Sequence, residues 1–599
     1  MINRIKNYKQ IYQLLALALI AFVLLFRLGT TNTTAFIKGD GQGYYAYLPY
    51  VFLYHNNYDD LENAISQNYP SGFHDFINDH EEKKYNFTFV GLSILLLPYF
   101  FFAHIITLVF GGVPDGYSYF YQLSVPIAAI SYLLVGLYFL GKILSRFKLH
   151  KIIIAAIQIF SVISTPILFY AIDGASYTHV YSFTAVVLLF YVFQTYLFNP
   201  KAKYIYIIGF IMGIIFLLRP INIIAVLFFL FFFDSFKDFG KRFLQLLNIH
   251  LIIALLIFFA MVFLQNIVYY FQINQFFIFA YKYAYFDFLD PQIINILFSY
   301  KKGLFIYTPI LLLVIPAIVY LFFKNPYKAL ISSLVLLFIT YLLSSWWSWW
   351  YGMSYGQRAF IEYYPLFFIV IGFALSYARY YIALITLVFS ISTPFLNVIQ
   401  IKQYKNYIFY WEMDKEIYWK YFLKTHWKYN NQSWIEKSTS PKSVYKVSDR
   451  KASSLSYSYD FENNFNTVID RYVRDYGVGN GMNYKVADMG GSLFYKNRIC
   501  KIFDNYQPIQ IHIAFDLLAQ QPLNKALVYI EIRHLDSIIY SKYIDVISQV
   551  KEGEWNNIVV SEEIADYYHK CDIIKITYYF DKTDSLYLDN YNLTFDQYQ

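Results

Sequence analysis

The sequence reads Lys38-Gly-Asp-Gly-Gln-Gly-Tyr-Tyr45 a few residues after its first apolar segment, residues 11–28. Three basic residues, Arg4, Lys6 and Lys9, precede that segment, which is typical of a retained signal anchor. A single acid in a Gly- and Tyr-rich loop beside a membrane bundle is a place where an enzyme could keep a general base. A transporter would instead hold its charged groups near mid-membrane.

The composition predicts a polytopic membrane protein. Of the 599 residues, 58% are hydrophobic and only 15% are charged, and the mean hydropathy is +0.38. These values exclude an ordinary soluble protein. The net charge of +8 requires no nucleic acid, because the basic residues lie where membrane topology places them.

The apolar segments predict about eleven spans, since a spanning helix needs about 20 residues. Basic residues gather in alternate short connections, at 142–151, 201–203, 237–242, 324–328 and 379. The inside-positive rule then places the N-terminus inside and the C-terminus outside. The expected spans are 11–28, 120–141, 151–170, 179–198, 203–219, 220–235, 245–266, 303–323, 328–345, 359–378 and 381–399.

Residues 85–112 are also apolar, but a further span there would reverse the side of every later basic loop. Pro98 interrupts the segment and it contains His104. We therefore interpret it as helices on the outer membrane surface, within a long first external loop, 29–119.

The last third of the chain differs from the rest. Residues 1–400 form the expected membrane domain, 401–439 an amphipathic interfacial segment, and 440–599 a polar domain. Alternating runs such as 509–515 and 526–532 predict an extracytoplasmic antiparallel β-sandwich. Cys500 and Cys571 could form a disulfide there or remain free thiols.

Asp40 is the candidate base. Its neighbouring glycines would let a substrate approach the backbone closely, and apolar surroundings would raise its pKa toward a useful range. The alternative is an Asp-Gly turn with no chemical role.

Cations on the predicted outer side could bind a phosphate. Arg219 lies in Leu218-Arg-Pro-Ile-Asn222, and guanidinium forms bidentate bonds with phosphate; snorkelling to the interface is the alternative. Arg358 could act likewise or pair with Glu362 at i,i+4. Lys302 breaks the inside-positive pattern, which indicates an anionic headgroup or simple anchoring.

Aromatic and imidazole side chains could contact a sugar. The run Trp346-Trp-Ser-Trp-Trp350 precedes the Gly-rich turn beside Arg358, and part of it also fits a membrane aromatic belt. His179 closes a short external loop that begins at Asp173; it could bind substrate, although a lone His at a span end is more often structural.

Several motifs are absent from the sequence. It contains no P-loop, dinucleotide fingerprint, HExxH or paired Cys/His motif. Adjacent acids do occur in the first loop, as at Asp59 and Asp60. The sequence therefore leaves room for a divalent cation but requires no cofactor.

These elements in this order resemble the GT-C superfamily of membrane glycosyltransferases. Asp40 with Tyr44 and Tyr45 is similar to the first-loop acidic motif of the protein O-mannosyltransferase and aminoarabinose transferase group. Segments 218–222, 302–309 and 355–365 also resemble bacterial members, so the resemblance covers roughly residues 1–400. The family motif often has two acids, whereas here a single Asp40 stands between glycines.

The resemblance implies an inverting transfer from a polyprenyl-phosphate-linked sugar to a glycan, lipid or protein outside the cytoplasm, at a bacterial plasma membrane. Asp40 would be the base and Arg219, Arg358 and Lys302 would bind the donor phosphate. Substrate would be contacted by Tyr44, Tyr45, His179, Trp350 and Glu362. The C-terminal domain looks like a carbohydrate-binding jelly roll.

Two other functions compete with this hypothesis. A lipid or polysaccharide transporter predicts charges within spans and an inverted repeat, which the sequence does not show. A non-catalytic scaffold for cell-envelope assembly could keep the same architecture. The sequence identifies neither the sugar nor the acceptor.

Overall fold

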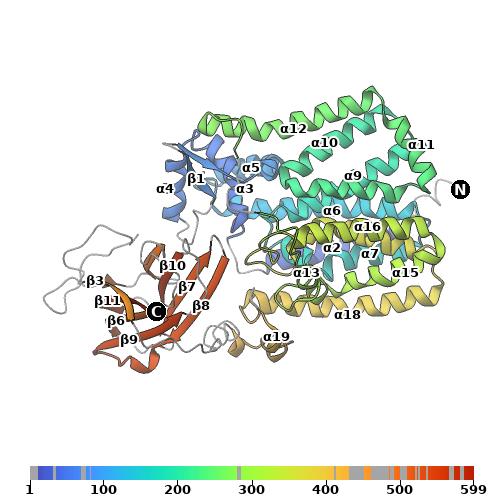
Figure 1. Cartoon of the computed structure of the whole chain (residues 1–599). Helices are drawn as coiled ribbons and strands as arrows, with labels where there is room; N and C mark the ends of the chain where they lie inside the picture. The colour runs from blue at the N-terminus through green and yellow to red at the C-terminus, as the bar shows by residue number, and fades with distance from the viewer. Residues whose placement is uncertain are drawn as a thin grey trace. The chain divides into compact units, whose positions relative to one another are not determined.

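The chain forms two compact units, residues 1–427 and 428–599, in the computed structural model shown in Figure 1. Each is described by itself. The structure describes residues 11–30, 35–68, 76–80, 83–278, 285–410, 413–430, 451–459, 484–485, 492–498, 509–519, 523, 526–534, 537–564, 573–580 and 586–598.

The first unit is a bundle of apolar helices. Long helices run side by side across it, and α11 lies at one end while α3 and α4 lie at the other (Figure 1). The first part of the unit consists of α2 (Ile11–Gly29), α3 (Asp40–Phe52), α4 (Tyr58–Asn68), the hairpin β1 (Ile77–His80) and β2 (Lys83–Asn86), α5 (Gly91–Val109), α6 (Tyr119–Ser145), α7 (Lys151–Ile163), α8 (Ile167–Tyr170), α9 (His179–Phe198) and α10 (Ala202–Leu218).

3-10 helices interrupt the second part of the bundle, and two of them, η1 and η2, begin with proline, which fits the first helical turn. This part consists of η1 (Pro220–Phe232), α11 (Phe236–Leu246), α12 (Ile249–Ile273), α13 (Ile293–Phe298), α14 (Leu304–Tyr307), η2 (Pro309–Leu313), α15 (Val314–Lys324), α16 (Pro326–Ser344), η3 (Arg358–Tyr363), α17 (Tyr364–Leu375), α18 (Tyr380–Lys405), α19 (Lys415–Tyr421) and η4 (Trp427–Tyr429).

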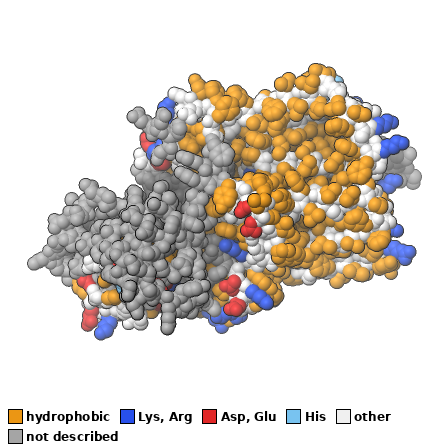
Figure 2. All heavy atoms as spheres, viewed as in Figure 1, with side chains coloured by type: hydrophobic (Ala, Val, Ile, Leu, Met, Phe, Trp, Pro, Cys, Tyr) orange, Lys and Arg blue, Asp and Glu red, His pale blue; other side chains and the backbone are white. Residues whose placement is uncertain are grey.

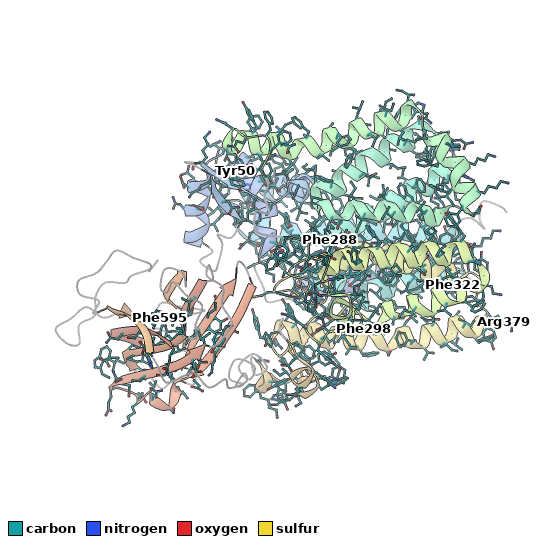
Figure 3. The ribbon with its side chains drawn as sticks, viewed as in Figure 1. Tyr50, Phe288, Phe298, Phe322, Arg379 and Phe595 are labelled. Carbon is teal, nitrogen blue, oxygen red and sulfur yellow. The ribbon has the colours of Figure 1, made fainter. Side chains whose placement is uncertain are left out.

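Within the described residues, eight helices are long and apolar enough to cross a membrane, or nine if η1 and α11, bent by 118°, count as one span. Apolar side chains cover the visible face of this unit, and Lys and Arg gather at one edge (Figure 2). The first unit is therefore that of a multi-pass membrane protein. Arg379 and Phe322 lie at one end of the bundle, and Tyr50 and Phe288 lie toward the other end (Figure 3).

The expected spans correspond to apolar helices, but not all have the expected length. Three expected spans, 151–170, 203–219 and 303–323, contain apolar helices of only 10–17 residues. The expected span 220–235 is a 3-10 helix followed by a sharp bend. The described residues thus contain eight or nine helices of spanning length, and the count of about eleven spans stays a prediction.

Residues 85–112 do not contain the several helices expected, and their position on the outer membrane surface stays a prediction. Pro98 lies inside one continuous helix, α5, which is long and apolar enough to span a membrane. The Tyr132 hydroxyl of α6 donates to the Leu95 carbonyl at 3.0 Å, one turn before the proline. α5 therefore packs against α6 close to the point where proline removes one backbone donor.

The expected interfacial segment 401–439 is not one helix. α18 continues to Lys405, a turn follows, and α19 is a separate short helix whose N-cap, Asp414, accepts a bond from the Ile417 amide at 2.9 Å. The positions 431–439 lie outside the described residues.

The second unit contains two antiparallel sheets with the orders β5-β10-β7-β8 and β3-β11-β6-β9, and β4 also pairs with β11. Every second residue of β9 is buried, and side chains from both sheets share one apolar core. This is the architecture of a β-sandwich; jelly-roll connectivity stays a prediction, and Cys500 and Cys571 lie outside the described residues. The strands are β3 (Lys451–Tyr459), β4 (Tyr484–Lys485), β5 (Ser492–Arg498), β6 (Ile509–Ala519), β7 (Ala526–His534), β8 (Ser537–Asp545), β9 (Trp555–Ile564), β10 (Ile573–Phe580) and β11 (Leu586–Tyr598).

Candidate active site

The sequence predicts Asp40 in a loop, but in the structure Asp40 begins a helix. It is the first residue of α3, and Gly39 before it has a φ of 54°, a left-handed conformation that favours glycine. This turn rests on the loop before α9, where the Lys38 amide donates to the Ser176 hydroxyl at 3.3 Å. The side chain of Asp40 is 50% exposed, so its carboxylate remains accessible.

Arg358 holds the Asp40 carboxylate. Its Nη1 lies 2.7 Å from Asp40 Oδ2, and its own side chain is only 12% exposed. Burial would raise the pKa of Asp40, but the charges of Arg358, Arg219 and His179 outweigh it and lower that pKa below the ordinary value. The predicted upward shift is therefore wrong, because apolar walls are not the dominant surroundings of this acid.

A second charged group lies beside this ion pair. The Oε1 of Glu362 is 3.0 Å from His179 Nδ1 and 3.1 Å from Arg219 Nη1. Glu362 and His179 are fully buried, whereas Arg219 is 22% exposed. α10 ends at Leu218, because Pro220 disfavours helical geometry at the residue before it, Arg219. The Arg219 guanidinium therefore lies at the end of the helix.

The expected i,i+4 pair between Arg358 and Glu362 does not form. Both residues lie in η3, where a 3-10 helix aligns residues three apart and not four. Arg358 therefore reaches Asp40 and Glu362 reaches Arg219. Four segments far apart in the sequence contribute to one cluster of alternating charge.

Lys302 is buried on another side of the cluster, with 1% of its surface exposed. Its ammonium donates to the Gly352 carbonyl and, at 2.5 Å, to the Ser354 hydroxyl. Burial, and then the nearby charges of Arg358 and Lys301, lower the pKa of Lys302 well below its ordinary value.

The predicted aromatic contacts differ in accessibility. Tyr45 is fully buried and its hydroxyl donates to the Gly116 carbonyl at 2.7 Å, an arrangement that favours a structural role. Tyr44 is 8% exposed and lies near Arg219. Trp350 is half-buried, with Lys301 Nζ 3.9 Å from its ring centroid.

Asp173 belongs to a separate charged cluster. It forms ion pairs with Arg27 at the end of α2 and, at 2.6 Å, with Lys405 at the end of α18. Its side chain is 2% exposed. This buried acid ties the first and the last long helix of the bundle to the loop that supports Asp40.

Sequence reasoning missed several residues of the site. Tyr177 lies under Arg358, with its ring centroid 5.4 Å from the guanidinium carbon, and Tyr404 from the end of α18 lines a cleft beside Lys302. Neither stands out in a chain whose aromatic content is 22%. Among the described residues, no three His, Cys, Asp or Glu side chains are grouped so as to hold a metal ion.

Gly41 offers a test of how closely the Asp40 turn must fit. A Cβ at Gly41 would lie 2.1 Å from Ser176 Oγ and 2.7 Å from the Ser176 carbonyl oxygen, so Gly41→Ala should push the start of α3 away from its support. Since a displacement of about 1 Å can cost about a hundredfold in rate, we expect a loss of activity of that order with a folded protein. Gly240→Ala is the matched control, because a Cβ at Gly240 would have no other atom within 4 Å. If Gly41→Ala were as active as Gly240→Ala, the exact position of Asp40 would be unimportant.

Comparisons with known proteins give a coarse likeness to solved structures. No family model matches the sequence, and no curated protein matches it. Among solved structures, the archaeal oligosaccharyltransferase AglB from Archaeoglobus fulgidus, in complex with an inhibitory peptide and a dolichol-phosphate, is similar with a TM-score of 0.37 and 13% identity. The similarity covers 70% of this chain and 60% of that protein.

Proposed function

We propose that this protein is a membrane glycosyltransferase, which transfers a sugar from a polyprenyl-phosphate-linked donor to an acceptor outside the cytoplasm. The observation that carries the proposal is the accessible Asp40 carboxylate, held 2.7 Å from Arg358 and adjoined by the Arg219–Glu362–His179 group. An acid for proton removal and cations for a leaving phosphate are what this reaction needs at one place.

In the proposed reaction, the acceptor hydroxyl oxygen attacks the anomeric carbon from the face opposite the phosphate. The new C–O bond forms as the bond from the anomeric carbon to the phosphate oxygen breaks, and the configuration inverts. Asp40 takes the hydroxyl proton, and the lipid phosphate leaves with the electron pair of the broken bond. As the phosphate gains charge, Arg358 is drawn toward it, which makes the released Asp40 carboxylate a stronger base.

Arg219 and Arg358 are proposed to bind the donor phosphate, with Lys302 as a further cation of the same site. His179 and Glu362 would hold Arg219 in place and would not touch the sugar themselves. Tyr44 and Trp350 remain candidates for sugar contacts. We propose that the site faces the outside of a bacterial plasma membrane, together with a C-terminal sandwich that binds a glycan.

The test is binding of a panel of polyprenyl-phosphate sugars to the whole protein in nanodiscs. Because a hydrogen bond to a charged group contributes about 1.5–3 kcal/mol, Arg219→Gln should weaken binding of the preferred donor by about tenfold to a hundredfold. Arg242→Gln is the control, because Arg242 pairs with Asp238 at 2.8 Å, away from the site.

Donor binding followed by transfer of the sugar would support the proposal. No binding across the panel by folded protein would overturn it in favour of a scaffold. Movement of intact sugar-lipid across proteoliposomes, without transfer to any acceptor, would instead identify a transporter.

A further inference from the structure

A narrow cleft opens beside Lys302. It is small, with room for about one water-sized group, and it is partly open to solvent. Lys302 precedes α14, Ser354 follows the Trp-rich segment, and Tyr404 and Tyr410 come from the end of α18 and the turn after it. An ammonium, a hydroxyl and tyrosine side chains therefore line one small space.

Two cations near the cleft, Arg358 and Arg219, have carboxylate partners. Arg358 is paired with Asp40, and Arg219 with Glu362. Among the residues that the structure describes, Lys302 makes hydrogen bonds only with neutral groups, the Gly352 carbonyl and the Ser354 hydroxyl. A buried cation without a counter-ion is costly, and this charge is 1% exposed.

Gly352 brings the Lys302 cleft next to Arg358. Its carbonyl accepts from Lys302, and a Cβ on Gly352 would lie 3.7 Å from Arg358 Nη2. The Nε of Arg358 is buried and has no hydrogen-bond partner in the described part of the chain. Arg358 does not line the cleft itself, but Gly352 links its guanidinium to the Lys302 ammonium.

We propose that this cleft is a subsite for one anionic group, a phosphate or a carboxylate, carried by a sugar-containing ligand. The cleft has room for about one oxygen atom of that anionic group. The rest of the ligand would therefore lie outside it. The inference rests on the proposed function for the source of the anion: the phosphate of the lipid donor, or an acid group on the acceptor glycan.

The experiment measures binding of three probes, inorganic phosphate, farnesyl phosphate and methyl glucuronate, to the full chain in detergent by calorimetry. We expect at least one probe to bind, and Lys302→Met to weaken it at least tenfold. Lys302→Met should fold, because it removes an uncompensated buried charge, and Lys302→Arg should retain binding.

Lys328→Met is the matched control. Lys328 is also a buried lysine, with bonds to the Phe231 and Phe233 carbonyls at 2.9 and 3.0 Å, but Asp234 lies 3.9 Å away.

The outcomes separate the two sources. Lys302-dependent binding of both phosphate probes assigns the cleft to the donor, and dependence for glucuronate alone assigns it to the acceptor. Equal binding by wild type and Lys302→Met, or none at all, overturns the inference even if transfer is observed. Lys302-dependent binding without any sugar transfer would retain the subsite and overturn the proposed function.

Discussion

Asp40→Asn is expected to lower the rate of sugar transfer by about a hundredfold to ten-thousandfold, the usual contribution of a general base. Asparagine keeps the shape of the side chain but cannot take the acceptor proton. It also releases Arg358, which then has no carboxylate 2.7 Å away and can bind the donor phosphate fully. We therefore expect unchanged or tighter donor binding together with slow transfer.

The measurement is transfer rate and donor affinity on the same preparation, with the unfolding midpoint as a check. Asp59→Asn is the control, because Asp59 is an exposed acid that pairs with Lys84 at 2.7 Å. If Asp40→Asn transferred sugar at the wild-type rate, Asp40 would not be the base. Loss of donor binding and transfer together would instead make Asp40 a structural partner of Arg358.

Glu362→Gln is expected to destabilise the bundle by about 3 kcal/mol, because removing one member of a buried charge group leaves the others uncompensated. Glu362 has no exposed surface and serves both His179 and Arg219. The measurement is the unfolding midpoint in a denaturant titration. Asp238→Asn, which breaks the partly exposed pair with Arg242, should cost about 0–1 kcal/mol.

A double replacement tests whether the loss of stability comes from the uncompensated charge of Arg219. Replacing Arg219 and Glu362 together by methionine removes both charges, so it should recover much of the stability that Glu362→Gln loses. It should not recover donor binding, since the proposed phosphate ligand is gone. A Glu362→Gln protein as stable as wild type would mean that Glu362 is neutral in the folded state.

The sequence predicted the two-part architecture well, because hydropathy and strand alternation are strong local patterns. It failed at α5, where Pro98 was taken as a break although the helix is continuous there. Hydropathy also does not give the exact lengths of the helices within the apolar segments. Those lengths depend on tertiary packing and on prolines such as Pro220.

At the site, residue types were easier to predict than partners. Asp40, Arg219, Arg358 and Glu362 do gather in one cluster, but their pairing follows from the 3-10 geometry of η3, which sequence spacing does not report. The pKa of Asp40 was misjudged for the same reason, because its closest charge, Arg358, comes from a distant segment. Tyr45 was assigned to substrate although its environment is fully buried.

The buried acid Asp173 has a consequence for how the protein is made. The ribosome delivers Arg27 and Asp173 early, and Lys405 only near the end of the membrane unit. Until the last long helix inserts, this acid has one of its two cationic partners, and the loop that supports Asp40 is held from one side. A chain that stops before α18 would therefore carry every proposed catalytic residue yet lack the Lys405 partner of Asp173.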